Sequence, residues 1–109
     1  MNVTLYLWQR ATALLLAPLV FVHLWLILYA VRGGLSATEI LSRTQGSIGW
    51  GLFYGLFVVA AAIHASIGLR TVINEWSGIS GRFLNTIASA FGLVLLLLGW
   101  RAVYAVVAV

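Results

Sequence analysis

Long runs of apolar residues alternate with short polar segments along the chain. The apolar runs cover residues 11–31, 50–73 and 83–109, and within them only Arg70 and Arg101 carry a formal charge. Each run is long enough to cross a hydrocarbon core of about 30 Å as a helix that rises about 1.5 Å per residue. Because backbone groups in lipid must bond to one another within a segment, the runs predict helices. We therefore expect an all-α integral membrane protein, with three transmembrane helices at about 11–31, 50–73 and 83–108 in a single domain over residues 1–109.

The polar segments predict how these helices are connected. Residues 32–49 are rich in glycine and in hydroxyl-bearing residues, which is typical of a loop, and residues 36–43 have the pattern of a short amphipathic helix. Residues 76–82 predict a tight turn between the second and third spans. Pro18 lies inside the first run and predicts a kink, which membrane helices tolerate.

Composition narrows the classes of function. Only 7% of the residues are charged, against about 25% in soluble domains, and 63% are hydrophobic. A soluble globular enzyme, a disordered tail and a nucleic-acid-binding protein are therefore disfavoured. The net charge of +4 comes from arginines that are scattered singly, so no basic patch forms. No cysteine is present, so the chain itself holds no disulfide and no cysteine-ligated zinc or iron–sulfur cluster.

The arginines do not choose an orientation in the membrane. Three fall on the side of the N-terminus and three on the opposite side, so the positive-inside rule gives a tie. The two sets are Arg10, Arg70 and Arg82, and Arg32, Arg43 and Arg101. Residues 1–9 lack the cationic segment of a signal peptide, so we expect the first run to be retained as a span.

Two histidines lie where ionisable residues are rare. His23 is in the middle of the first run and His64 in the middle of the second. Counted from the run edges at helical rise, they lie about 18 Å and about 14 Å from the N-terminal face, so both are predicted at mid-membrane depth. An ionisable side chain inside a membrane is costly and indicates a function. Neutral imidazole is a good ligand for haem iron, and a bis-histidine haem needs two imidazoles that face each other.

The surroundings of the two histidines differ. Ala60, Ala61 and Gly68 lie three or four residues from His64, so one helix face beside that imidazole is small-sided and leaves clearance for a flat porphyrin. Ordinary helix packing with an interhelical hydrogen bond from His64 is the alternative. His23 has no such face, which favours a hydrogen bond or a contact with a haem edge over ligation.

The region around His64 resembles a known family. Residues 63–70 (Ile-His-Ala-Ser-Ile-Gly-Leu-Arg), with an acid eleven residues after the histidine, resemble the second-span signature of the succinate dehydrogenase (succinate:quinone oxidoreductase) cytochrome b membrane anchors. The opening of the first span, Gln-Arg-Ala-Thr-Ala at residues 9–13, is similar to the smaller of the two hydrophobic anchors, the D-type anchor. Three spans in a chain of 109 residues also fit that anchor. Arg70, six residues after the histidine, is instead similar to the larger, C-type anchor, which stays the alternative.

The resemblance implies a membrane anchor of succinate dehydrogenase/fumarate reductase, which is a non-catalytic subunit of the complex. Its partners would be a flavoprotein with FAD, an iron–sulfur subunit and a second membrane anchor. Electrons from succinate oxidation would pass through the iron–sulfur clusters to a quinone, and a haem b would lie between the two anchors. The complex would lie in a bacterial cytoplasmic membrane or an equivalent respiratory membrane.

The resemblance also implies roles for single residues around the haem. His64 would be the axial ligand of the haem iron and Gly68 would give the porphyrin clearance. Arg10 would pair with a haem propionate, since a guanidinium suits a carboxylate, although a simple interfacial anchor is the alternative. In relatives with two haems, first-span histidines ligate the second one, so a ligand role for His23 stays open.

Two further residues match the quinone site of the family. Trp76 stands where the pattern of the D-type anchor often has tyrosine, and its indole N–H can donate to a quinone carbonyl but cannot accept. An ordinary aromatic residue of the membrane interface is the alternative for Trp76. Glu75 would relay protons to the quinone or set the local field. The alternative for this carboxylate is an ion pair with Arg82 or Arg70 at the end of the helix.

Two other functions compete with this one. A cofactor-free structural assembly subunit would associate with soluble partners but bind no haem. A small transporter subunit would be expected to carry a mid-membrane carboxylate, and both Glu39 and Glu75 lie outside or at the ends of the spans.

Overall fold

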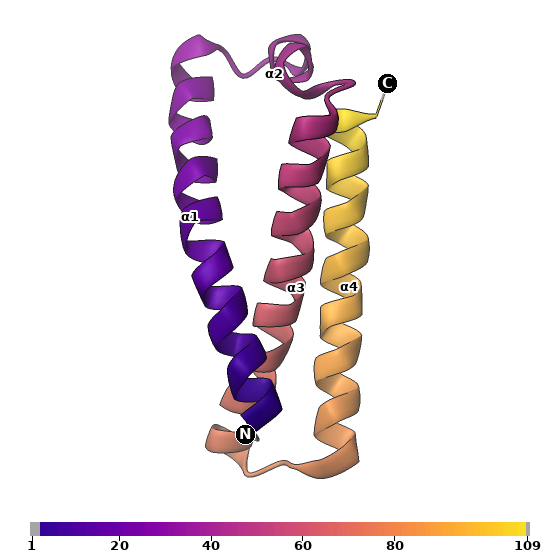
Figure 1. Ribbon diagram of the computed structural model, residues 1–109. Helices are drawn as coiled ribbons and strands as arrows, with labels where there is room; N and C mark the ends of the chain where they lie inside the picture. The colour runs from indigo at the N-terminus through magenta and orange to yellow at the C-terminus, as the bar shows by residue number, and fades with distance from the viewer. Residues whose placement is uncertain (1–2, 109) are drawn as a thin grey trace.

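The computed structural model describes residues 3–108, in which three long helices and one short helix follow one another. They are α1 (Val3–Gly33), α2 (Ala37–Thr44), α3 (Ile48–Ser77) and α4 (Gly81–Val107). The long helices run up and down beside one another, which gives an elongated molecule of 48 × 23 × 22 Å (Figure 1). All three are long and apolar enough to cross a membrane. The prediction of an all-α protein with three membrane spans is confirmed.

Each long helix begins earlier than predicted, and α1 and α3 also end later. Helix α1 starts at Val3 rather than at residue 11, and α3 continues to Ser77 rather than ending at residue 73. The apolar run measures only the part of a helix that lies in hydrocarbon. The helix itself continues into the interface, because each further turn still satisfies its own backbone groups.

Helices α3 and α4 form the tightest contact in the described chain. Ser66 Oγ donates a hydrogen bond of 2.7 Å to the carbonyl oxygen of Ala88, so the two backbones lie close together. Leu84, at the start of α4, is fully buried. The other buried apolar residues are small or medium in size and lie on these two helices: Ala60, Ala62, Ile67, Ala88 and Val103.

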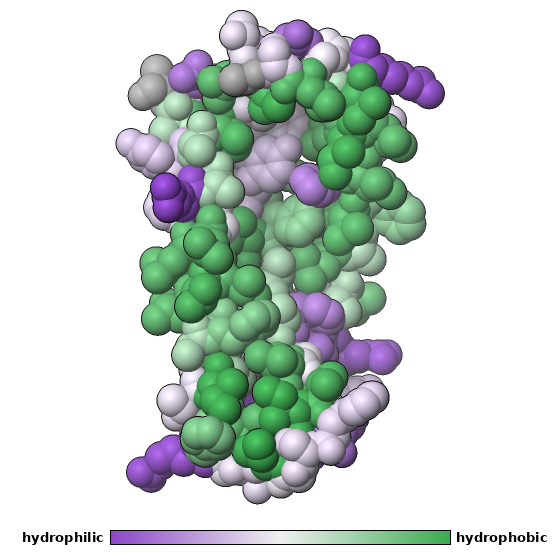
Figure 2. Space-filling model, turned by 180° about the vertical axis from the view of Figure 1, so that it is seen from behind, coloured by the Kyte–Doolittle hydropathy of each residue, from purple (hydrophilic) through white to green (hydrophobic). Residues whose placement is uncertain are grey.

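Most large apolar side chains point outward. Figure 2 shows one face of the molecule on which apolar residues cover most of the surface and polar residues gather mainly towards the two ends. Trp25, for example, is 64% exposed and Leu14 is 77% exposed. Such surfaces suit lipid tails or further membrane helices, because hydrocarbon around a helix is as apolar as leucine.

Helix α1 contacts α3 at one end and diverges from it at the other. Figure 1 shows α1 close to α3 near the N-terminus and further from it towards α2, with a change of direction on the way. Pro18 lies inside α1 and its ring nitrogen has no hydrogen to donate, which agrees with the predicted kink. Thr12 is the buried residue of α1.

Helix α2 lies across the end of the bundle opposite the N-terminus, where the sequence predicted a short amphipathic helix (Figure 1). The hydroxyl of Ser36 caps it by accepting a hydrogen bond of 3.2 Å from the backbone N–H of Glu39. Thr44 Oγ1 donates a hydrogen bond of 2.6 Å to the carbonyl oxygen of Val106, which ties α2 to the end of α4.

The turn between α3 and α4 is shorter than predicted. Helix α3 ends at Ser77 and is capped by Gly78, whose φ of 73° is the left-handed conformation that glycine adopts without strain. Its N–H donates a hydrogen bond of 3.0 Å to the carbonyl oxygen of Asn74, and α4 begins at Gly81. The end of α3 and the start of α4 therefore lie at the same end of the bundle as the N-terminus (Figure 1).

Candidate functional site

His64 contacts a threonine on the neighbouring helix. Its Nδ1 atom lies 3.2 Å from Oγ1 of Thr12, so α1 and α3 meet through a polar pair at this level. Thr12 is only 5% exposed, and its hydroxyl also lies 2.8 Å from the carbonyl oxygen of Trp8 and 3.1 Å from that of Gln9. The interhelical hydrogen bond that the sequence left as an alternative is therefore present.

The other ring nitrogen of His64, Nε2, has no partner among residues 3–108. Within the described part of the chain, Nε2 makes no hydrogen bond, and the side chain is half-buried. A ring held through one nitrogen and free at the other has the arrangement of a metal-ligating histidine, in which a hydrogen bond at the far nitrogen orients the ring. The hydrogen bond to Thr12 and a ligand role for His64 are thus compatible.

Gly68 lies one turn further along α3 and faces Gln9 of α1. A Cβ atom at position 68 would lie 3.5 Å from Nε2 of Gln9, which is ordinary contact, so packing within this chain does not require glycine there. The Oε1 atom of Gln9 is buried and has no hydrogen-bond partner among the described residues. A buried acceptor without a donor costs about 1–3 kcal/mol, so this spot beside His64 favours a donor from outside the chain.

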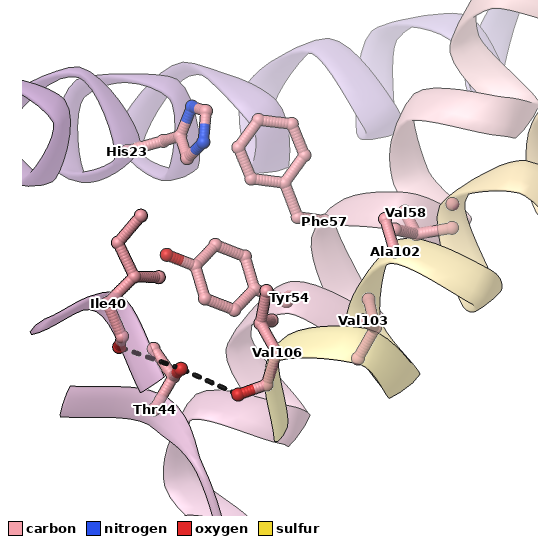
Figure 3. A pocket seen from close by; sticks show the side chains of 10 residues that line it. His23, Ile40, Thr44, Tyr54, Phe57, Val58, Ala102, Val103 and Val106 are labelled. Atoms are coloured by element: carbon pink, nitrogen blue, oxygen red, sulfur yellow. Dashed lines mark hydrogen bonds between the residues drawn. The ribbon is translucent and has the colours of Figure 1, made fainter. Parts of the chain in front are cut away.

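His23 lies in a different environment. Its ring packs edge-on against Phe57, with centroids 5.2 Å apart, and against Tyr54, with centroids 6.1 Å apart. Figure 3 shows these rings beside a cavity between α1, α3, α4 and α2. The cavity has a volume of about 330 Å³, and Thr44 and Val106 lie on its far side. Neither nitrogen of His23 bonds to a described residue.

The two histidines lie at different levels along the bundle, and the predicted difference of only about 4 Å between their levels is wrong. Thr12 marks the level of His64 on α1, and His23 lies eleven residues further along that helix, or about 16 Å at helical rise. The estimate failed because it counted from the edges of the apolar runs, whereas α1 begins eight residues earlier and meets α3 near its own N-terminus.

This separation excludes one metal ion held by both histidines. Two imidazole nitrogens on opposite sides of one ion lie about 4 Å apart, because bonds of this kind are about 2 Å long. No group of three or more histidine, cysteine or acidic side chains comes together among residues 3–108. The described chain therefore brings no second histidine to His64.

Arg10 lies at nearly the same level of the bundle as His64, but its side chain points away from α3. It lies two residues before Thr12, which turns its side chain by about 200° around α1 from the face that Thr12 presents to α3. The side chain is exposed, and its guanidinium carbon lies 5.7 Å from the centroid of the Tyr6 ring. Within the chain, the structure does not bring Arg10 to His64.

Glu75 and Trp76 lie at the end of α3, about 16 Å along the helix from His64. Trp76 is 87% exposed, and Glu75 beside it also lies towards the surface. Glu75 pairs with no described residue, and Nε of Arg70 instead donates a hydrogen bond of 2.8 Å to Oδ1 of Asn85. The predicted alternative, an ion pair between Glu75 and Arg70 or Arg82, does not form in the described chain.

Sequence reasoning did not single out Thr12, Gln9 or Tyr54 as members of these sites. A signal for the first two was present, because Gln9 and Thr12 are polar residues three positions apart at the start of an apolar run and therefore share a helix face. Tyr54 stands in a run of aromatic residues and carries no comparable signal.

One comparison with known proteins finds a match. A family model described as succinate dehydrogenase/fumarate reductase transmembrane subunit matches residues 1–107. No curated protein and no solved structure shows significant similarity to the chain. The matched range includes both histidines and all three membrane spans.

Proposed function

The chain belongs to the family of succinate dehydrogenase/fumarate reductase transmembrane subunits, and we propose that it is the anchor that contributes a haem ligand and part of the quinone site in such a complex. Membership implies association with other subunits of the complex. We infer that these are a flavoprotein with FAD, an iron–sulfur subunit and a second anchor, in a respiratory membrane such as the bacterial cytoplasmic membrane. The opening of α1 favours the role of the smaller, D-type anchor.

The observation that carries the proposal is the state of the His64 ring. This imidazole lies within a membrane helix, is half-buried, is held at Nδ1 by Thr12 and has no described partner at Nε2. An imidazole nitrogen without a hydrogen-bond partner is costly inside a membrane, and a metal ion bound at Nε2 would remove that cost. The residues present therefore fit one axial ligand of a haem b, with the other from the second anchor. When bound, the haem would supply a one-electron carrier.

The neighbouring residues would shape this site. Gly68 lies one helical turn from His64 and has no side chain to fill the space beside it. The buried amide oxygen of Gln9 lies on the same side and makes this space polar. Arg10 lies at nearly the same level on the outer side of α1, and its long cationic side chain would pair with a haem propionate. This pairing is supported by charge and depth, not by a contact within the chain.

Glu75 and Trp76 would face the quinone at the end of the bundle where α3 stops. The side chain of Trp76 is exposed, and its indole N–H would donate a hydrogen bond to a quinone carbonyl. Glu75 has no ion pair within the described chain, which leaves its carboxylate free to hold or pass a proton. Quinone reduction consumes two protons, so a carboxylate at this position suits the reaction.

His23 has a separate role in the proposal. It lies too far from His64 to ligate the same haem iron, so a ligand role for it would require a second haem. The edge-on contacts with Phe57 and Tyr54 support a packing role beside the cavity instead.

The test is the visible spectrum of the purified complex. The assembled complex should give a b-type reduced-minus-oxidised spectrum, and His64→Ala should remove it while the subunits still co-purify. An intact complex without haem in the unaltered protein would favour a structural assembly subunit. A chain that purifies with neither partners nor haem would favour a transporter subunit, and either result would overturn the proposal.

A further inference from the structure

We infer that Thr12 is a positioning residue for His64, which fixes the proton of the imidazole on Nδ1 and leaves the lone pair of Nε2 for the metal. The inference rests on the proposed function, because it concerns the ligand that we assign to the haem. It adds a residue of α1 to a site whose ligand lies on α3.

The positions of three atoms decide where the protons lie. The Thr12 hydroxyl has one hydrogen, and its nearest acceptor is the carbonyl oxygen of Trp8 at 2.8 Å, with the Gln9 carbonyl next at 3.1 Å. The Nδ1 atom of His64 is further away, at 3.2 Å. The hydroxyl therefore donates to the backbone, and its oxygen accepts a hydrogen bond from Nδ1–H.

The oxygen of Thr12 is held in place before any ligand binds. A helical threonine has few rotamers, and one of them allows Oγ1 to bond the carbonyl oxygens three and four residues earlier, as Thr12 does. The residue is 5% exposed, so neither water nor lipid competes for the hydroxyl. The acceptor that faces His64 is thus preorganised by the backbone of α1.

Two consequences follow for the ligand. With the proton on Nδ1, the imidazole presents an unprotonated Nε2, whereas the other tautomer would place a hydrogen where the metal must bind. A hydrogen bond from Nδ1–H also makes the imidazole a stronger donor to the metal. A stronger donor stabilises the oxidised metal, so this bond lowers the midpoint potential of the bound group.

A matched pair of variants tests the inference in the assembled complex. Thr12→Val has nearly the same shape but no hydroxyl, and Thr12→Ser keeps the hydroxyl. We expect Thr12→Val to raise the midpoint potential of the haem and to weaken haem retention about 10- to 100-fold, as loss of the hydrogen-bond partner of a metal ligand typically does. Thr12→Ser should restore both. Redox titration followed in the visible spectrum measures the potential, and haem per complex measures the retention.

The outcomes separate this inference from the proposed function. If His64→Ala loses the haem but Thr12→Val keeps the potential and retention of the unaltered complex, the positioning role is wrong and the ligand assignment stands. Equal changes in Thr12→Ser and Thr12→Val would also overturn it, since the hydroxyl would then not matter. If the His64→Ala complex keeps its haem, the ligand assignment in the proposed function is wrong, and the role of Thr12 is wrong with it.

Discussion

Val58 of α3 lies against the bare backbone of Gly99 in α4, so close that a Cβ atom at position 99 would lie 2.5 Å from Cγ1 of Val58. A side chain cannot occupy that space unless Val58 or one of the helices moves. The contact between α3 and α4 therefore depends on glycine at this position.

Gly99→Ala should destabilise the chain by about 1–3 kcal/mol, the usual cost of adding atoms to a filled contact. Unfolding of the purified protein in mixed detergent would measure the difference in free energy. Gly55→Ala is the matched control, because apart from the adjoining backbone of α3 no described atom lies within 4 Å of a Cβ there. Combining Gly99→Ala with Val58→Ala should recover much of the loss, and failure to do so would contradict the close-approach explanation.

Thr44→Val should loosen the attachment of α2 to the end of α4. The substitution removes the hydroxyl that donates to the Val106 carbonyl oxygen at 2.6 Å, a bond worth about 1 kcal/mol. Hydrogen exchange of the α2 amides should become faster. Thr86→Val is a suitable comparison, since that exposed hydroxyl bonds only within α4 to the carbonyl oxygen of Arg82, and α2 should not respond to it.

His23→Phe should leave the haem content of the complex unchanged. A phenyl ring keeps the edge-on contacts with Tyr54 and Phe57, and our proposal gives the imidazole nitrogens no metal to bind. Pyridine haemochrome analysis measures haem per complex. A loss of one of two haems would instead show that His23 ligates a second one.

Glu75→Gln should slow quinone reduction by about 10²-fold, since a positioned proton donor contributes at least this much in most enzymes. Haem content and assembly should not change, because Glu75 holds no ion pair within the described chain. Steady-state quinone reduction by the complex measures the effect. Glu39→Gln, at the opposite end of the bundle, should reduce quinone at the rate of the unaltered protein. Equal rates of quinone reduction in the two variants would show that Glu75 has no role in the quinone site.

Gln9→Leu should stabilise the isolated chain by about 1 kcal/mol, because it removes a buried amide oxygen that no described residue satisfies. The free energy of unfolding of the isolated chain tests this expectation, and a loss of stability would show that the amide oxygen of Gln9 has a donor there.

The sequence predicts the spans of this fold well and the register between them poorly. The length and apolarity of each run determine that α1, α3 and α4 cross the membrane, because lipid leaves a helix few alternatives. Nothing local determines that Thr12 rather than His23 lies level with His64. That pairing depends on where α1 touches α3, and many outward-facing leucines would pack equally well in several registers.

The candidate site also depends partly on local sequence patterns and partly on contacts between helices. His64 is recognisable because a lone imidazole in an apolar run is costly and needs a reason. Thr12 is easy to overlook, since a threonine inside a membrane helix satisfies its own hydroxyl, and the polar face that it shares with Gln9 does not say which residue of another helix it contacts. Glu75 and Trp76 are predicted only by resemblance, because helix-end residues at a membrane surface have an ordinary interfacial explanation.

The small interior of this protein has a consequence for the cell. Among the described residues, few apolar side chains outside α3 and α4 are buried within the chain. A copy that has not assembled with its partner subunits therefore leaves most of its length accessible to membrane proteases. Unassembled copies should therefore be short-lived, so the amount of this subunit should follow the amount of its partner subunits.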